Sequence, residues 1–304
     1  MHAGLPAHGY GRVTTMEVRP IHGGFAREVS GLELWRELPD PILAALRDAW
    51  TRHGVLVFRR QSLSEAEYAA FGRHFGELDV TVRPDWGSRH RSGVIHISNM
   101  RDGTGESIGG LGAGELDWHT DQSYVANPST GSMLYMVEMP PDGGRTYWAN
   151  LKLAWEALPE ATKRRIEPLH VVYDYLLRQS TYDDEAPMSK ELRRRTPPVA
   201  HPLVNIHPMT GEKALYLDPV TAAGIEGWPE DESRNLLGEI RAHAVRPEFV
   251  YAHDWRIGDV VMWDNGFLMH RRDEFDSAAL RWLKRTTLYL PPERHIVPPS
   301  HFVT

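Results

Sequence analysis

The sequence contains no cysteine among its 304 residues. This absence excludes disulfide frameworks, zinc ribbons, iron–sulfur clusters and thiol nucleophiles. Any bound metal ion must therefore be held by nitrogen and oxygen ligands. The sequence offers 16 histidines and 41 acidic residues for that role.

Long apolar runs and an excess of positive charge are also missing. No uncharged apolar run approaches the roughly eighteen residues that a membrane span needs, and the N-terminus lacks the apolar segment of an export signal. The net charge is −7, and the basic residues are dispersed rather than gathered into a nucleic-acid footprint. With a mean hydropathy of −0.44, the sequence predicts a cytoplasmic protein without a membrane or nucleic-acid partner.

Short strand patterns dominate the chain, and hydrophobic residues make up 41%, enough for a sizeable core. The spacing of apolar residues predicts helices at 41–53, 64–75, 151–165 (restarting at Pro159) and 230–244, the second opened by a capping box from Ser64 to Glu67. Strands are predicted at 55–58, 94–98, 132–139, 146–149 (returning after a turn at 140–144), 169–176, 203–206, 214–217, 249–252, 259–263 and 286–290.

These strands and helices do not alternate regularly, which disfavours a parallel α/β sheet. The pattern instead predicts a mainly β fold with flanking helices, of the jelly-roll type. No internal repeat or low-complexity linker divides the chain. We therefore expect residues 1–304 to form a single domain with a helical N-terminal portion and a helical insertion.

A candidate metal motif occurs at Trp118-His119-Thr120-Asp121. Residues two positions apart on a strand point to the same face, so an imidazole and a carboxylate could converge on one ion. A distant histidine would complete a two-His, one-carboxylate triad, which suits non-haem Fe(II). A His-x-Asp pair is common by chance, however, and a surface turn with a capping aspartate is the alternative interpretation.

The C-terminal third supplies the context that this motif needs. A strand pattern leads into Trp263-Asp264-Asn265 and then His270, and Arg281 and Arg285 follow eleven and fifteen residues after that histidine. A metal-chelating 2-oxo acid such as 2-oxoglutarate has a far carboxylate that needs a fixed cation, for which the planar fork of arginine is best suited. On a strand, residues four apart share a face; the alternative is that both arginines are exposed strand charges.

At this point the sequence resembles the taurine dioxygenase and 2,4-dichlorophenoxyacetate dioxygenase (TauD/TfdA) family of Fe(II)- and 2-oxoglutarate-dependent oxygenases. The resemblance covers nearly the whole chain, and its ordered set of motifs is specific. The motifs are Gly54-Val55-Leu56-Val57-Phe58-Arg59, Phe75-Gly76-Glu77-Leu78, Ile97-Ser98-Asn99, Trp118 to Asp121, Pro140 to Thr146, His201-Pro202-Leu203-Val204, Gly258 to Asn265 and His270.

The resemblance implies a double-stranded β-helix, with Fe(II), 2-oxoglutarate and O₂ as cofactor and cosubstrates and with succinate and CO₂ as products. It implies that His119, Asp121 and His270 ligate iron. It also implies that Thr146 bonds 2-oxoglutarate and that Arg281 pairs with its far carboxylate. An intact Asp121 argues against the related halogenases, and members of the family suggest a homodimer or homotetramer.

The substrate is less well defined by the residues. By the resemblance Arg285 lies beside substrate or cosubstrate, and a cation there favours a small organic anion, which would be hydroxylated and in some cases cleaved. Asn99, Glu115 and Tyr124 flank the metal motif and are further candidates for the pocket, although packing or surface positions would equally explain them. The segment 79–86 lacks both the histidine of taurine enzymes and the lysine pattern of herbicide-cleaving enzymes.

Two other functions would use the same ligands. A hydrolase or lyase could bind Zn²⁺ at the three side chains, but zinc alone leaves Arg281 and Thr146 unexplained. A non-catalytic protein could bind 2-oxoglutarate as a sensor, but the chain shows no output domain. Succinate release and metal dependence would distinguish these alternatives.

Overall fold

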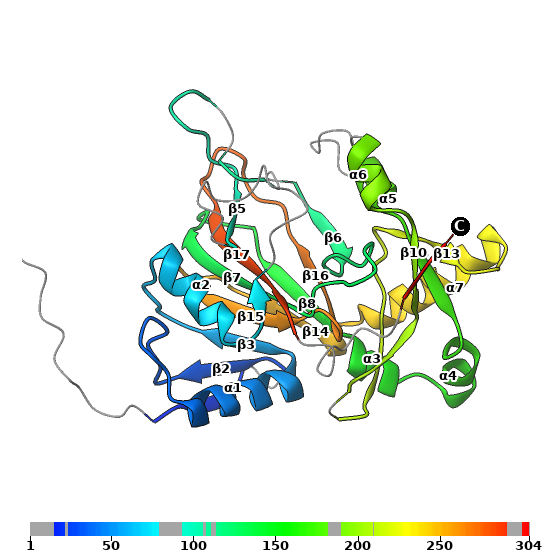
Figure 1. Cartoon of the computed structure of the whole chain (residues 1–304), viewed down its shortest axis with the longest axis horizontal. Coiled ribbons are helices and arrows are strands. Elements are labelled where there is room, and N and C mark those ends of the chain that lie inside the picture. Colours follow the sequence, from blue (N-terminus) through cyan, green and yellow to red (C-terminus); the bar gives the residue numbers. More distant parts are fainter. Residues whose placement is uncertain are drawn as a thin grey trace, which may run out of the picture.

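The structure is a computed structural model, and it describes residues 15–21, 24–78, 93–105, 108–110, 114–181, 190–208, 210–290 and 300–303. Its strands form a larger sheet, a smaller sheet and a third group of strands that carries several helices (Figure 1). Within these described residues, no helix combines the length and the apolar character that crossing a membrane would require.

The larger sheet has the order β1-β2-β3-β15-β7-β17-β4, and β5 also pairs with β17. Its strands are β1 (Glu17–Pro20), β2 (Arg27–Ser30), β3 (Val55–Phe58), β4 (Glu77–Leu78), β5 (Ile95–Ser98), β7 (Gly131–Glu138), β15 (Val260–Asp264) and β17 (Trp282–Tyr289). The pairs are antiparallel except β2 with β3, which run parallel.

Both faces of the central strands of this sheet are buried. In β3, Leu56 and Phe58 pack in one core with residues of the N-terminal helices, whereas Val55 and Val57 pack in a second core. Successive side chains of a strand point to opposite faces, so an unbroken apolar run is what a strand between two cores requires. The covering helices, α1 (Asp40–His53) and α2 (Glu65–Arg73), lie against the sheet in Figure 1.

The smaller sheet has the order β14-β8-β16-β6. Its strands are β6 (Leu116–His119), β8 (Thr146–Asn150), β14 (Val250–His253) and β16 (Leu268–Arg272). Trp148 and Leu268 from this sheet join the same core as Val55 and Val57 from the larger sheet. The core therefore fills the space between two sheets, which confirms the predicted mainly β, jelly-roll architecture with flanking helices.

The segment between β8 and β14 contains most of a further sheet as well as helices. The order of this sheet is β13-β9-β10-β18, and β11 pairs with β12. The strands are β9 (His170–Tyr173), β10 (Val199–Pro202), β11 (Val204–Ile206), β12 (Lys213–Leu215), β13 (Ala222–Ile225) and the C-terminal β18 (His301–Phe302). The helices are α3 (Leu151–Glu156), α4 (Glu160–Ile166), α5 (Tyr175–Thr181), α6 (Lys190–Arg195), α7 (Glu230–Ala244) and the 3₁₀ helix η2 (Pro247–Phe249).

Local signals located several elements correctly. The capping box of α2 forms as predicted, with Ser64 accepting from the backbone of Glu67 and the Glu67 side chain accepting in return. α7 has the predicted bounds. The strand predicted at 169–176 is wrong beyond Tyr173, because Asp174 accepts the backbone N–H of Leu176 at 2.9 Å and so begins α5 in the manner of an N-cap residue.

The strand predicted at 146–149 forms as β8, but it does not return beside β7. β7 pairs with β15 and β17, whereas β8 pairs with β14 and β16. Between them, Gly143 and Gly144 have φ values of 77° and 66°, a left-handed conformation that glycine adopts readily. The chain thus leaves the larger sheet here and enters the smaller one, and this step places Thr146 at the start of β8.

Candidate metal centre and adjoining buried arginine

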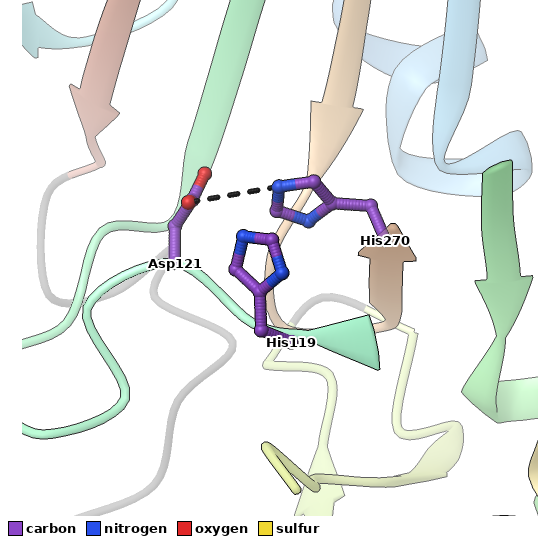
Figure 2. A group of neighbouring side chains, drawn as sticks. All are labelled: His119, Asp121 and His270. Atoms are coloured by element: carbon purple, nitrogen blue, oxygen red, sulfur yellow. Dashed lines mark ion pairs between the residues drawn. The ribbon is translucent and has the colours of Figure 1, made fainter. Parts of the chain in front are cut away.

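The three predicted metal ligands meet at one point. His119 ends β6, and His270 on β16 is its Cα partner in the antiparallel ladder. The potential ligand atoms of His119, Asp121 and His270 all lie within 4.8 Å of one another, and all three residues are buried. Figure 2 shows the three side chains pointing toward one another.

Asp121 reaches this centre from a turn rather than from a strand. β6 ends at His119, so the expected strand alternation between His119 and Asp121 is wrong. The next residue, Gln122, has a left-handed φ of 58°, a conformation that costs a non-glycine residue roughly 1–3 kcal/mol. Tyr289 donates its hydroxyl to Oε1 of Gln122 at 2.6 Å. The turn, supported from β17, aims the carboxylate at the two histidines.

The two oxygens of Asp121 have different neighbours. Oδ2 accepts the hydroxyl of Ser132 at 2.7 Å and lies 2.7 Å from Nη2 of Arg285, whereas Oδ1 lies 3.7 Å from Nε2 of His270. Burial raises the pKa of Asp121, but Arg285, the two histidines and the Ser132 hydroxyl outweigh burial and hold that pKa below its usual range. The carboxylate is therefore ionised, with Oδ2 anchored and Oδ1 directed at the ligand point.

Both histidines are prepared as neutral ligands. Burial is the main cause that lowers the pKa of His119 to about 3 and that of His270 to about 4. Nδ1 of His119 lies 2.7 Å from the carbonyl oxygen of Asp117. A carbonyl can only accept, so Nδ1 carries the proton and the lone pair of Nε2 is available to a metal. Nδ1 of His270 is buried without a hydrogen-bond partner among the described residues.

The Trp263-Asp264-Asn265 motif contacts residues that position the candidate metal ligands. Asn265 donates Nδ2 to the hydroxyls of Ser129 at 3.0 Å and Ser132 at 3.2 Å, and its Oδ1 accepts from Nε1 of Trp263 at 2.8 Å. The Trp263 ring also packs 4.9 Å, centroid to centroid, from the ring of His270. One motif thus braces a metal-facing imidazole directly and the Asp121 carboxylate through Ser132.

Arg281 is buried next to the start of β8. It precedes β17 by one residue, so it is not on the strand as expected, and it is only 3% exposed. Its Nη2 donates to the carbonyl of Gly144 at 3.2 Å, whereas its Nε has no hydrogen-bond partner among the described residues. Burial, and then the charge of Arg272, lower the pKa of Arg281 well below its ordinary value.

Thr146, at the start of β8, has a buried hydroxyl that is held by a hydrogen bond. It is 3% exposed, and its Oγ1 accepts from Nε1 of Trp255 at 3.0 Å. Because the oxygen is already an acceptor, the hydroxyl proton is available for a second group. A buried guanidinium and a hydroxyl donor are the partners that a carboxylate requires.

Two of the four candidate substrate residues have other contacts. The Oδ1 of Asn99 accepts the backbone N–H of Arg281 at 2.9 Å, and its Nδ2 donates to the carbonyl of Ala279 at 2.8 Å. Both ends of this amide hold the segment before β17. Glu115 is exposed and lies 3.1 Å from Nη1 of Arg271.

The other two candidates lie at the metal centre. Arg285 is the cation paired with Asp121. Tyr124 follows Asp121 by three residues, and its ring centroid is 4.4 Å from that of Tyr175 on α5. Arg178, one helical turn after Tyr175, lies close enough to influence the pKa of Tyr124, although burial has the largest effect there and raises it.

Several residues around the site were not predicted. Among them, Ser132, Trp255, Arg178 and Arg272 contact or electrostatically influence the predicted residues. Of these four, Arg272 had a usable signal, since a residue two positions after His270 on a strand shares its face. The substrate comparison based on 79–86 lies outside the described residues.

The chain is similar over most of its length to proteins that are already known. A family model described as "Taurine catabolism dioxygenase TauD, TfdA family" matches residues 17–287. The alpha-ketoglutarate-dependent 2,4-dichlorophenoxyacetate dioxygenase of Cupriavidus pinatubonensis is 35% identical over 280 residues, which cover 88% of this chain and 96% of the relative. The alpha-ketoglutarate-dependent sulfate ester dioxygenase of Pseudomonas putida is 30% identical over 285 residues, which cover 90% and 89%.

A solved structure extends the likeness to three dimensions. The crystal structure of AAD-2 in complex with Mn(II) and N-oxalylglycine matches with a TM-score of 0.78 and 31% identity, and the match covers 92% of this chain and 99% of that one. The similarity therefore extends over nearly the whole length of both molecules.

Proposed function

Because this chain belongs to the TauD/TfdA family and is a dioxygenase that uses Fe(II), 2-oxoglutarate and O₂, we propose that His119, Asp121 and His270 hold its iron. The observation that carries this assignment is the convergence of their ligand atoms within 4.8 Å of one another. Two neutral imidazoles and one ionised carboxylate are the donor set of the facial triad that suits non-haem Fe(II).

Arg281 and Thr146 are proposed to bind the far carboxylate of 2-oxoglutarate. Arg281 supplies a buried guanidinium whose Nε has no partner among the described residues, and Thr146 supplies a hydroxyl proton. The metal and cosubstrate, when bound, supply the activation of O₂ with release of succinate and CO₂. The residues of the chain orient these groups: Asp117 holds His119, and Ser132 holds Asp121.

The proposed substrate is a small organic anion that is oxidised, and in some cases cleaved, at a carbon near its charged group. Relatives named above act on a phenoxyacetate and on sulfate esters. Arg285 pairs with Asp121 through Nη2, and its Nε has no hydrogen-bond partner among the described residues, so it stays a candidate cation for the substrate. Arg178 is a second candidate cation. The charge of Arg178 lowers the pKa of both His119 and His270, although burial lowers both more, and Arg285 has a larger effect than Arg178 on His270.

The position of Arg178 on α5 supports this role. Residues three apart on a helix lie on one face, so Arg178 shares the face that brings Tyr175 within 4.4 Å of Tyr124. Through Tyr175, this face of α5 contacts Tyr124, three residues after Asp121. A negative group held there would lie beside the metal, where its neighbouring C–H bond could be oxidised.

A substrate panel tests the proposal. Phenoxyacetates, alkyl sulfates and alkyl sulfonates are compared with their neutral amides or alcohols, and succinate formed on addition of substrate is measured. We expect succinate to be formed when an anionic substrate is added. We also expect Arg178→Gln to raise KM for the best anion more than it lowers kcat. The matched control is Arg193→Gln, at an exposed arginine on α6. Equal turnover of neutral analogues, unaffected by Arg178→Gln, would contradict the assignment.

The same assay addresses the two alternatives. Turnover with Zn²⁺ in the absence of 2-oxoglutarate would support a hydrolase or lyase, and 2-oxoglutarate binding without O₂ consumption would support a sensor. The single-domain organisation, the cytoplasmic location and the dimeric or tetrameric state stay predictions. Sedimentation of the purified protein measures the last of these.

A further inference from the structure

Arg272 lies on the same face of β16 as the metal-facing His270. It is the last residue of the strand, two positions after His270, and it is 4% exposed. Its Cα partner in the ladder between β16 and β8 is Thr146. Directly opposed residues of an antiparallel pair have Cβ atoms roughly 4.5–5.5 Å apart on one face. Arg272 is therefore a close neighbour of the Thr146 side chain.

Arg272 and Arg281 also share one aromatic ring. Their guanidinium carbons lie 5.3 Å and 5.6 Å from the ring centroid of Phe275. After burial, the charge of Arg272 is the next cause that lowers the pKa of Arg281. Two buried cations this close repel each other, and an anion bound beside both would offset that repulsion.

We propose that Arg272 is a second cation for the far carboxylate of 2-oxoglutarate, acting with Arg281 and Thr146. This inference rests on the proposed function, because it requires the cosubstrate to lie against Arg281 and Thr146. Two guanidiniums that lie against one aromatic ring, Arg272 at the end of β16 and Arg281 just before β17, can each pair with one oxygen of a carboxylate. A 2-oxo acid without a far carboxylate would gain from neither cation.

One contact of Arg272 is consistent with a purely structural role. Its Nη2 donates to the carbonyl of Gly114, which lies two residues before β6, the strand that ends at His119. If Arg272 served only to hold this segment, its loss would disturb β6 and weaken metal binding as well as cosubstrate binding. Metal affinity measured without 2-oxoglutarate therefore separates the two roles.

Arg271 provides the matched control. It has the same charge and lies on the same strand, but its guanidinium carbon lies 4.0 Å from the ring centroid of Tyr147 and its Nη1 lies 2.7 Å from Asp273. Successive residues of a strand point to opposite faces. Arg271→Gln thus removes an equal charge from the face away from Thr146.

The experiment measures binding to the full-length protein. Mn(II) affinity is determined alone, and the affinities of 2-oxoglutarate and 2-oxopentanoate are then determined on the Mn(II)-loaded protein, the weaker ligand by competition. For Arg272→Gln we expect the preference for 2-oxoglutarate over 2-oxopentanoate to shrink about tenfold or more, with Mn(II) affinity unchanged. Arg271→Gln should leave all three values near those of the wild type.

Two results would overturn the inference: an unchanged preference in Arg272→Gln, or a fall in Mn(II) affinity that accounts for the whole effect. Arg272→Lys is the second variant if the glutamine variant does not fold, and it should retain part of the preference because it keeps the charge. Failure of the proposed function is distinguishable, since then the wild type itself would show no preference and Arg281→Gln would change nothing.

Discussion

Ser132 donates its hydroxyl to Oδ2 of Asp121 at 2.7 Å. The other carboxylate oxygen, Oδ1, lies on the side of His270, at 3.7 Å from its Nε2. The serine is itself held by Asn265 from the Trp263-Asp264-Asn265 motif. The direction of the proposed metal-binding oxygen is therefore set by a side chain that does not itself face the metal.

Ser132→Ala should weaken metal binding without removing it. Loss of a group that orients a metal ligand typically costs about 10- to 100-fold in affinity, and we expect a loss in this range for Mn(II) titrated into the metal-free protein. Ser129→Ala is the control, because Ser129 contacts Asn265 but is not bonded to the carboxylate of Asp121. Unaltered Mn(II) affinity in Ser132→Ala would show that the hydrogen bond does not orient the ligand.

Arg281→Met should weaken 2-oxoglutarate binding and leave Mn(II) binding nearly intact. Removing one partner of a desolvated charge pair costs about 2–5 kcal/mol, and the residue is only 3% exposed. The affinity of the Mn(II)-loaded protein for 2-oxoglutarate, measured by calorimetry, checks this. Retention of wild-type affinity would mean that another cation meets the far carboxylate.

Trp255→Phe should reduce 2-oxoglutarate affinity by a smaller factor. The change removes the Nε1–H that Thr146 accepts at 3.0 Å, and with it the constraint on the threonine hydroxyl. One neutral hydrogen bond is worth about 0.5–1.5 kcal/mol, so the loss should be clearly smaller than that in Arg281→Met. If Trp255→Phe binds 2-oxoglutarate as tightly as the wild type does, while Thr146→Val binds it more weakly, the tryptophan is not needed to orient the threonine hydroxyl.

His201 should make the metal-free protein less stable in acid. Burial lowers the pKa of His201 to about 4, below the usual value of about 6.5. The folded state thus resists protonation that the unfolded state accepts, so stability is fully present above pH 6.5 and is lost as pH falls toward 4. At about pH 5 this single group should have removed about 2 kcal/mol of the free energy of unfolding.

The measurement is urea unfolding with a chelator present, at about pH 7.5 and about pH 5. His201→Gln keeps an N–H for the carbonyl of Val125, which the imidazole Nε2 contacts at 3.0 Å, but it cannot titrate. The stability lost between the two pH values should be about 2 kcal/mol smaller in the variant. His74→Gln serves as the control, and an equal loss in wild type and His201→Gln would contradict the assignment.

Much of the fold could be predicted from the sequence because the patterns that specify it are local. The unbroken apolar run Val55–Phe58 predicts a strand buried on both faces, and Ser64 with Glu67 predicts the start of α2. The path from β7 to β8 could not be predicted, because each strand pairs with strands that are distant in the sequence. Gly143 and Gly144 signalled a turn but not the change of sheet that they permit.

The convergence of His119, Asp121 and His270 was predicted from residue types, spacing and the family resemblance, although the geometric reason given for Asp121 was wrong. Its position depends on the turn at Gln122, which is held by Tyr289 from a distant strand. Arg178 and Trp255 could not have been found from spacing, since each meets the site through an element that arrives from elsewhere in the chain. Tertiary contacts, rather than local pattern, decided these positions.

We propose that His119, Asp121 and His270 together hold a single metal ion. Mn(II) or Fe(II) is titrated into metal-free wild type, Asp121→Ala and His270→Ala under anaerobic conditions, with unfolding in urea as a check that each variant is folded. We expect one tightly bound ion per wild-type chain and no tight binding in either folded variant. A variant that is folded and binds the ion with wild-type affinity and stoichiometry would contradict it.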